Sequence, residues 1–263
     1  MYLDLSFTII TLNEEKNLRH CLASLPKGVE IIIVDSNSVD NTAKIAAEYK
    51  AKFLTRKFTD YSEQKNFALE KATRNWVFSI DADEELSKDL REALEEFIAK
   101  QENTNSSTSF YIARRLVFLG KVMRFGKTQD APLRLIKRGA AKFKGQIHEA
   151  LDVDNSMTKK FQKGHLLHYS YDSLNTYFEK FNIYTSKVAL KHFSENKRPP
   201  SFCSLGFRLI LEFKTRYFLR LGFLDGYHGF LYAVISSFYA FIKYAKLKEL
   251  VEGASSFQNQ KNP

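Results

Sequence analysis

Apolar runs alternate with helical patterns over the first hundred residues of the chain. Leu5–Ile10 and Glu30–Asp35 are nearly continuous apolar runs, as expected of strands covered on both faces of a parallel sheet. Lys52–Leu54 and Trp76–Ile80 are shorter runs of the same kind, each bounded by turn formers. The pattern therefore predicts four strands.

Helices are predicted after each of these strands. Leu18, Leu22 and Leu25 repeat at helical spacing, with Asn13 as the expected N-cap. The apolar positions of the later helices are Ile45, Ala46 and Tyr49, then Phe67 and Leu69 after an opening Ser62, then Leu90, Leu94, Phe97 and Ile98 after Ser87. Right-handed crossovers make an open, Rossmann-like α/β sheet the expected fold.

Polar residues follow the predicted strands at their carboxyl ends, where ligands bind in open α/β sheets. They are Thr11, Asn13, Asp35, Asp81 and Asp83. The chain has no Gly-x-Gly-x-x-Gly and no complete Gly-x-x-x-x-Gly-Lys-Ser/Thr loop, so neither a dinucleotide fold nor a P-loop is supported. A nucleotide would be held through its base, its ribose and a metal.

Four carboxylates occupy five positions directly after Ile80. Carboxylates crowded at the edge of a sheet repel one another, and a hard divalent cation that holds a phosphorylated ligand compensates for this. On this interpretation Asp81 and Asp83 approach one metal and its diphosphate. The alternative is a solvated loop before a helix, where acidic residues are favoured by the helix dipole.

The middle of the chain contributes further candidates. Phe110–Leu119 and Ala131–Ile136 are expected strands, and Arg134 lies in the second. His148 and Glu149 are adjacent, so on a strand only one of them would face a shared site. A surface pair without function is the alternative interpretation.

Composition limits the class of protein. The 263 residues, 44% hydrophobic and 27% charged, suit either one core or one domain of about 200 residues with an appendage. A net charge of +10 allows nucleic acid, an anionic membrane or an acidic substrate as partner. Cys21 and Cys203 lie far apart, which indicates neither a zinc site nor a disulfide framework and fits a reducing cytoplasm. No basic segment precedes the first apolar run, so we expect a strand there and no signal peptide.

The composition changes in residues 202–248, where seven basic residues accompany two acidic ones among many Phe, Tyr and Leu. Phe207, Ile210 and Leu211 fit an amphipathic helix, and residues 226–242 lack Asp, Glu, Lys and Arg. That run is at the lower limit for crossing a bilayer. Helices in the membrane interface are the preferred interpretation. The alternatives are a helical pair packed on the catalytic domain or on a second subunit, and a single spanning helix.

Several short motifs, in order, resemble those of family-2 glycosyltransferases of the GT-A fold. They are Thr11-Leu12-Asn13-Glu14, the segment from Ile33 to Thr42, Gln64-Lys65-Asn66 and Ile80-Asp81-Ala82-Asp83-Glu84. Pro132–Leu135, Ile147–Glu149 and Gly222–Gly226 narrow the resemblance to small bacterial enzymes that glucosylate the lipopolysaccharide inner core. The resemblance covers roughly residues 3–248.

The resemblance implies an inverting transfer of a sugar, glucose by the closest likeness, from a nucleotide sugar that is usually UDP-linked, with Mg²⁺ or Mn²⁺. By position, Thr11, Asn13 and Glu14 would line the nucleotide pocket, and Asp35 would contact the base. Lys65 would lie near the diphosphate. Asp81 would approach the ribose or donor sugar, and Asp83 would bind the metal. Many relatives have Asp where this chain has Ser36, and Arg where it has Lys65. The first departure leaves the uracil contact, and with it the nucleotide, open.

The expected chemistry follows from charge. The leaving diphosphate would be stabilised by the metal at Asp83 and by cations such as Lys65 or Arg134. The acceptor hydroxyl needs a carboxylate base, for which Glu149 is the first choice and Asp130 the second. His148 would contact the metal or a phosphate, or serve as a structural histidine.

The expected organisation is a GT-A catalytic domain over residues 1–200, with a nucleotide-binding half to 100 and an acceptor half beyond. A membrane-associating helical extension (201–248) and a disordered tail (249–263) follow. The partners would be a nucleotide sugar, a glycolipid or lipopolysaccharide-core acceptor and the inner leaflet of the cytoplasmic membrane. The rivals are a non-catalytic nucleotide- or nucleic-acid-binding protein and a nucleotidyltransferase. Carboxylates at the ligand edge argue against nucleic acid, because they would repel a polyanion.

Overall fold

The structure, a computed structural model, describes residues 2–100, 107–145 and 150–259. The chain forms two compact units. The first unit is Met1–Arg115 with Asp130–Tyr169, and the second is Leu116–Gln129 with Ser170–Pro263. The expected boundary at residue 200 does not coincide with this division, because the helix over residues 174–194 packs within the second unit.

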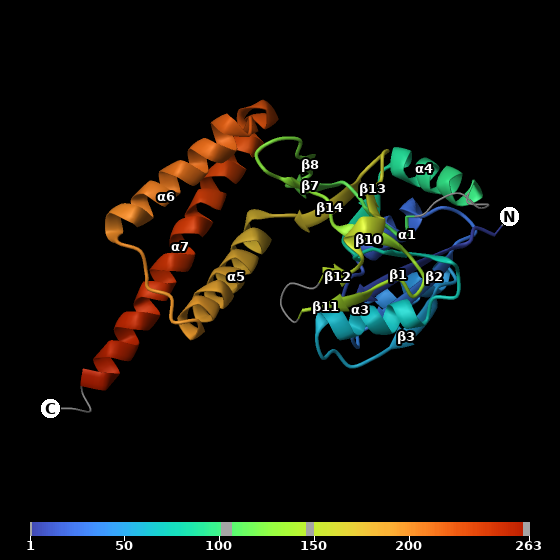
Figure 1. The fold of residues 1–263 in the computed structure, drawn as a ribbon, viewed down its shortest axis with the longest axis horizontal. Coiled ribbons are helices and arrows are strands. Elements are labelled where there is room, and N and C mark those ends of the chain that lie inside the picture. Colours follow the sequence, from blue (N-terminus) through green and yellow to red (C-terminus); the bar gives the residue numbers. More distant parts are fainter. Residues whose placement is uncertain (1, 101–106, 146–149, 260–263) are drawn as a thin grey trace. The chain divides into compact units, whose positions relative to one another are not determined.

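Seven described strands form the main sheet of the first unit, in the order β13-β6-β10-β4-β1-β2-β3. Several of them are labelled in Figure 1. They are β1 Leu5–Thr11, β2 Glu30–Asp35, β3 Lys52–Thr55, β4 Trp76–Ser79, β6 Ser109–Tyr111, β10 Leu133–Lys137 and β13 Thr158–Lys160. The strands β4, β1, β2 and β3 pair in parallel, whereas β10 pairs antiparallel with β4 and β6. The predicted α/β fold is confirmed, with a sheet that is mixed.

The helices between these strands are those that the apolar spacing predicts. They are α1 Leu18–Ser24, α2 Thr42–Glu48, α3 Tyr61–Glu70 and α4 Lys88–Ala99. The Ser87 side chain caps α4 by accepting from the Leu90 amide, a contact of about 1 kcal/mol. The predicted cap Asn13 is wrong: it has φ 55° in the turn before α1, whose N-cap is Asn17. Asp60, not Ser62, caps α3.

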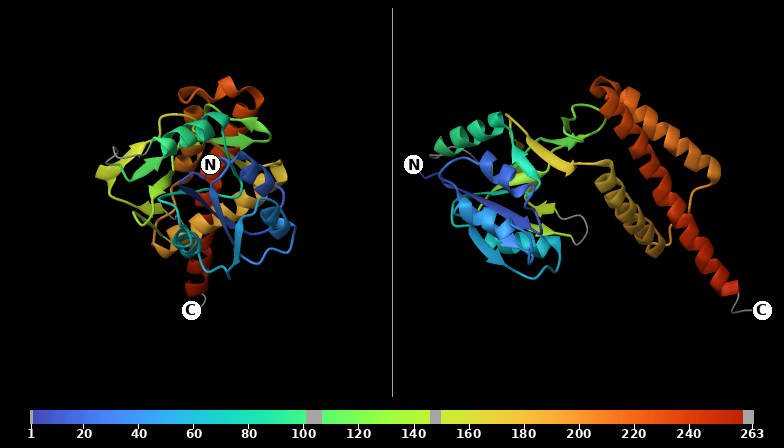
Figure 2. Two further views of the ribbon diagram at one scale, coloured as in Figure 1. Left: turned by 90° about the vertical axis from the view of Figure 1, so that its right-hand side faces the viewer. Right: turned by 180° about the vertical axis from the view of Figure 1, so that it is seen from behind.

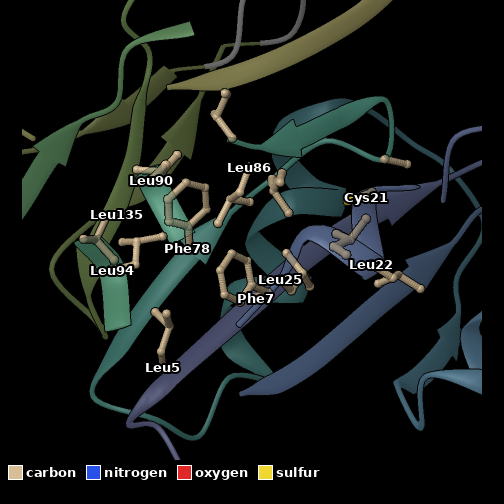
Figure 3. Packing of buried hydrophobic residues seen from close by; sticks show 14 of the residues in the cluster. Leu5, Phe7, Cys21, Leu22, Leu25, Phe78, Leu86, Leu90, Leu94 and Leu135 are labelled. Carbon is tan, nitrogen blue, oxygen red and sulfur yellow. The ribbon is translucent and has the colours of Figure 1, made fainter. Parts of the chain in front are cut away.

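The sheet buries a different core on each face. Alternation along the strands sends Phe7 and Ile33 to a cluster with α1, α2 and α4, and Ile32 to a smaller cluster on the side of α3. Figure 3 shows the larger cluster, where Phe7 and Phe78 stack at 5.1 Å between ring centroids beneath leucines of α1 and α4. A sheet covered on both faces explains why its strands are apolar throughout.

Short strands complete the two units. They are β5 Glu84–Leu86, β7 Arg114–Phe118, β8 Lys121–Val122, β9 Gln129–Asp130, β11 Lys142–Lys144, β12 Ala150–Asp152 and β14 Leu166–Tyr171, with a 3-10 turn at Asn155–Met157. The single strand expected over residues 110–119 is instead β6 and β7. The strand is interrupted because neighbouring residues bond to different segments. The Ile112 amide donates to the Pro132 carbonyl, whereas the Ala113 carbonyl accepts from the Leu166 amide of β14.

The second unit is built mainly from α5 Leu174–Ser194, α6 Phe202–Lys214 and α7 Gly226–Asn259, with a π-turn at Thr215–Leu219 and a 3-10 turn at Gly222–Asp225 between the last two. In Figure 2, α6 runs antiparallel along α7. Among the described residues, no helix combines the length and apolar character needed to cross a membrane. Residues 249–259 continue α7, so the prediction of a disordered tail is wrong for these residues. Glu249, Leu250 and Glu252 have high helix propensity, which favours this continuation.

The two glycines Gly164 and Gly139 give a matched test of the packing against α4. Both have positive φ (79° and 80°), but a Cβ on Gly164 would lie 2.2 Å from the Leu90 nitrogen, whereas Gly139 has open space. We expect Gly164→Ala to lower the free energy of unfolding by roughly 3–5 kcal/mol, because backbone atoms must move. Gly139→Ala should cost only the left-handed strain of about 1 kcal/mol. Urea unfolding followed by fluorescence of Trp76, the single tryptophan, reports on this unit; equal losses in the two variants would contradict the packing.

Candidate functional site

The carboxyl ends of three parallel strands bring the predicted polar residues to one edge of the sheet. Thr11 at the end of β1 lies in register with Asp35 at the end of β2. Ser79 of β4 lies in register with Thr8 of β1, so the acidic loop that follows β4 emerges at the same edge. This placement is the one that the strand pattern predicts.

Asp35 fixes the loop after β2. It is 2% exposed, and its carboxylate accepts from Thr11 Oγ1 at 2.9 Å and from the Ser38 amide at 2.7 Å. Asn13 joins the same loop: its amide donates to Ser38 Oγ at 2.8 Å and its Oδ1 accepts from the Val39 amide at 2.9 Å. The two turns are therefore held against each other through polar side chains.

Glu14 extends this network to the start of α2. Its amide donates to Thr42 Oγ1 at 2.9 Å, and its carboxylate accepts from Asn17 Nδ2 at 2.9 Å. The predicted nucleotide-lining residues Thr11, Asn13 and Glu14 thus lie at the end of β1 and in the turn after it, and this turn is hydrogen-bonded to the loop that Asp35 fixes. Their contacts with a nucleotide remain a prediction.

Helix α3 links the loop after β2 to the loop after β4. Gln64 Nε2 donates to Ser36 Oγ at 3.1 Å, and the next residue, Lys65, places Nζ 2.8 Å from Asp81 Oδ1. Both α3 side chains are buried. Ser36, the residue that departs from the family pattern, is therefore engaged in the scaffold of the edge.

Asp81 is held between two cations. Arg134 of β10, 4% exposed, donates from Nη2 to Asp81 Oδ2 at 2.6 Å, opposite the contact from Lys65. Burial by itself raises the pKa of Asp81, but the charges of Arg134 and Lys65 outweigh it and hold this pKa well below its ordinary value. Asp81 is therefore ionised at neutral pH, and its charge is already balanced within the protein.

Glu84 is the most buried carboxylate of the acidic loop, at 1% exposure. Its Oε1 accepts from Arg134 Nη2 at 2.6 Å and from Arg114 Nη1 at 2.8 Å, while its Oε2 accepts from the Asp81 amide at 3.1 Å. The pKa of Arg134 is raised: burial lowers it, and the neighbouring carboxylates more than compensate. Glu84 fixes both the turn after β4 and the guanidinium that neutralises Asp81.

Asp130, the second choice for a base, forms a bidentate ion pair with Arg114. The two contacts are 2.9 Å from Nε and 2.6 Å from Nη2. Burial raises the pKa of Asp130, and the hydrogen bonds and charge of Arg114 lower it further than burial raises it. A carboxylate stabilised in its charged form has a low affinity for a proton.

Asp83 faces a histidine that the sequence patterns did not single out. Antiparallel pairing of β14 with β5 sets His168 opposite Glu84, and His168 Nε2 lies 3.3 Å from Asp83 Oδ2. The Tyr169 amide donates to the Asp83 carbonyl at 2.9 Å, and the Tyr169 hydroxyl donates to Glu85 at 2.8 Å. Burial, and then this bond, raise the pKa of Tyr169 to about 12. Asp83 and His168 are 24% and 25% exposed.

The described residues offer no group of three or more His, Cys, Asp and Glu side chains placed to hold a metal ion. Asp83 and His168 form a pair of oxygen and nitrogen donors, which suits an ion that takes its remaining ligands from a substrate diphosphate and water. The donor chemistry therefore fits the expected metal with two protein ligands.

The structure brings together most of the predicted site residues in two connected groups. One contains Thr11, Asn13, Glu14 and Asp35, and the other contains Lys65, Asp81, Arg134 and Asp130, while Asp83 lies beside this second group in sequence and contacts His168. The predicted base Glu149 and metal contact His148 lie outside the described residues. Sequence reasoning missed Arg114 and His168, because no local pattern reveals which strands will pair beside the acidic loop.

Comparison with known families matches residues 6–152 to the model "Glycosyl transferase family 2". Over 93% of its length the chain is 34% identical to "Lipopolysaccharide core biosynthesis glycosyltransferase LpsC" of Rhizobium meliloti, and this match covers 92% of that protein. It is also 31% identical, over 94% of its length, to an uncharacterized glycosyltransferase of Rickettsia typhi, of which it covers 87%.

Two solved structures are more distantly similar. S. aureus TarS 1-349 matches with a TM-score of 0.43 and 14% identity, over 96% of this chain and 92% of that one. Glucosyl-3-phosphoglycerate synthase from Mycobacterium tuberculosis, in complex with Mn²⁺, UDP and glucosyl-3-phosphoglycerate, matches with a TM-score of 0.35 and 16% identity, over 52% and 57%. These scores are too low to bear on the fold or on the ligands of the present protein.

The ion pairs of Asp81 predict an acid-dependent stability. Because its pKa is lowered in the fold, the unfolded carboxyl takes up a proton at a higher pH than the folded one. The stabilisation is present above the ordinary pKa of 3.8 and is lost as the pH falls below it, by about 1.4 kcal/mol per pH unit. We expect Asp81→Asn to be less stable at pH 7 and to lack this slope below about pH 4.

The measurement is urea unfolding between neutral and acid pH, followed by Trp76 fluorescence. Asp89→Asn, at an exposed carboxylate on α4, is the matched control and should keep the wild-type slope. A constant stability difference between wild type and Asp81→Asn across the acid range would show that the ion pairs do not act as described.

Proposed function

The chain belongs to glycosyltransferase family 2, and we propose that it transfers glucose from UDP-glucose to a lipopolysaccharide-core acceptor with the help of Mn²⁺ or Mg²⁺. Transfer of a sugar from a nucleotide sugar is the activity of the family. The acceptor is suggested by the name of the relative from Rhizobium meliloti, and the donor by the resemblance of the motifs. Donor, acceptor position and metal are the parts to be tested.

The observation that carries the proposal is the different environment of the two aspartates after β4. Both side chains are partly exposed, at 26% and 24%, but Asp81 is balanced by Lys65 and Arg134, whereas Asp83 lies beside His168. A divalent ion at Asp83 and His168 would take diphosphate oxygens as further ligands. Because an imidazole nitrogen suits transition metals better than Mg²⁺, Mn²⁺ is the first ion to test.

The protein residues have separable roles in the proposed transfer. When bound, the metal supplies positive charge for the leaving diphosphate. Asp81, ionised and fixed by Lys65 and Arg134, would accept a hydrogen bond from a hydroxyl of the ribose or donor sugar. Lys65 adds a fixed positive charge near the diphosphate, where charge develops as the sugar–phosphate bond breaks.

Glu149 is the proposed base that takes the proton from the acceptor hydroxyl. The alternative, Asp130, has both carboxylate oxygens bound by Arg114 and a lowered pKa, so it is a weaker base. We assign Asp130 instead to holding Arg114, which in turn contacts Glu84. His148 remains the expected neighbour of Glu149 as a metal or phosphate contact.

The proposed place of action is the cytoplasmic face of the inner membrane. A glycolipid acceptor is confined to a bilayer, so an enzyme that remains near this surface meets it more often. The second unit supplies basic and aromatic side chains suited to the membrane interface. In the described part of the chain, no helix is both long enough and apolar enough to cross a membrane, which is consistent with peripheral attachment.

Removal of the proposed metal ligands should abolish turnover. We expect Asp83→Ala and His168→Ala to lower the rate of UDP-glucose hydrolysis or transfer, measured by mass spectrometry with Mn²⁺, by at least about 100-fold. UDP with Mn²⁺ should raise the melting temperature of the wild type and not of Asp83→Ala. Glu85→Gln, a neighbouring carboxylate that binds Tyr169, is the control and should retain activity.

Activity that survives both chelator and Asp83→Ala would refute the metal role, and stabilisation by oligonucleotides would favour the nucleic-acid alternative.

The assignment of the base can be tested by a pair of substitutions. Glu149→Ala should reduce transfer by about 10²–10⁴-fold while donor affinity changes little, because the base acts on the acceptor. Asp130→Asn should reduce it less and should lower stability, since Arg114 loses its bidentate partner. Full activity of Glu149→Ala together with inactivity of Asp130→Asn would transfer the role to Asp130.

A further inference from the structure

The turn between α6 and α7 exposes large apolar side chains more densely than any other segment that the structure describes. Six of them lie within residues 218–227, here named the apolar turn: Phe218, Leu219, Leu221, Phe223, Leu224 and Tyr227. Leu219 and Tyr227 are 73% and 69% exposed. Single exposed apolar residues are ordinary on protein surfaces, but a cluster of this kind indicates an interaction site.

The backbone of the apolar turn is closely packed beneath these side chains. A Cβ on Gly222 would lie 2.6 Å from the Arg216 carbonyl oxygen, and one on Gly229 would lie 1.9 Å from the Gly222 carbonyl oxygen. Leu221 adopts a left-handed conformation with φ 56°. The fold therefore accepts strain at this turn while its side chains remain in solvent.

A buried carboxylate fixes the turn from below. Asp225, 3% exposed, accepts hydrogen bonds from the amides of Arg124 and Phe125 at 3.0 and 2.9 Å. The Gly126 amide donates to the Arg220 carbonyl at 2.8 Å. Residues 124–126 and the apolar turn thus form one fixed element of the second unit.

The charge around the turn has one sign. Residues 116–129 and 214–230 contain six basic residues, and Asp225, their single acidic residue, is buried and used by backbone amides. The exposed members of the basic set are Arg124, Lys127, Lys214 and Arg220. Apolar and aromatic side chains bordered by cations match the interface of an anionic bilayer, whose surface attracts Lys and Arg side chains.

We propose that the apolar side chains of the apolar turn insert into an anionic lipid surface, with Arg124, Lys127, Lys214 and Arg220 contacting the headgroups. A second copy of the chain is a poorer occupant, because a two-fold contact at this patch would oppose the same cations. The proposal deepens the membrane location given above. Lipid binding itself requires neither donor nor metal, so it can fail or succeed independently of the proposed transfer.

The test is binding of the full chain to phosphatidylcholine vesicles with and without phosphatidylglycerol, measured by co-sedimentation. Wild type should bind the anionic vesicles, and less tightly at high salt. Leu219→Ser and Phe223→Ser should each weaken binding about tenfold, because an apolar side chain no longer enters the bilayer. Lys127→Gln should weaken it about fivefold, and only for vesicles with phosphatidylglycerol.

Matched controls come from α5, where Ile183 and Leu190 are 53% and 55% exposed. Ile183→Ser and Leu190→Ser should bind as the wild type does. All turn variants should retain the wild-type melting temperature and donor hydrolysis, and Asp83→Ala should retain vesicle binding. In Leu219→Trp, vesicles should shift the added fluorescence to shorter wavelength.

Three results would overturn the proposal. One is an equal loss of vesicle binding in the α5 and turn variants, which would show that the apolar turn is not a specific lipid-binding site. Another is unchanged vesicle binding in Leu219→Ser and Phe223→Ser. The third is a wild-type dimer, seen by analytical ultracentrifugation, that these substitutions dissociate without any effect on vesicles, which would identify the turn as a contact between copies.

Discussion

A cluster of four charges, in which Lys65, Glu84 and Arg134 are buried and Asp81 is partly exposed, is the interaction on which the ligand edge of the sheet depends. These residues come from α3, from the loop after β4, from the start of β5 and from β10, so the cluster joins a helix to both the parallel and the antiparallel part of the sheet. Removal of one partner of a buried ion pair leaves the remaining charge unpaired in an environment of low polarity. This lowers the free energy of unfolding by about 3–5 kcal/mol. The geometry of the acidic loop is therefore tied to the stability of the unit.

The cluster also gives different chemistry to carboxylates that look equivalent in the sequence. Asp81 is paired with two cations, and Glu84 is buried and paired with Arg134. Glu85 accepts a hydrogen bond from a tyrosine, whereas Asp83 lies beside His168. Environment, more than residue type, decides which carboxylate can accept a metal. The proposed metal role of Asp83 follows from what occupies its neighbours.

The division of the chain into two units changes how its middle section is understood. Residues 116–129 belong with the C-terminal helices, whereas residues 130–169 return to the sheet. In the second unit, Asp225 binds the amides of residues 124 and 125, and Phe118 packs against Tyr232 of α7. The C-terminal helices are thus completed by a segment from the middle of the chain, and a boundary placed by composition alone cuts through this unit.

The sequence by itself determined the parallel strands, the helices between them and the polar residues at the carboxyl edge, because apolar periodicity and turn chemistry are local properties. It also determined the family, since Thr11 to Glu14, Lys65 and Asp81 to Glu84 stand in the family's order. Only the tertiary structure decided that Arg134 neutralises Asp81, that Arg114 holds Asp130 and that His168 meets Asp83. These contacts join residues 16 to 85 positions apart, and they depend on which strands pair, a choice made by the burial of whole elements and left open by local pattern.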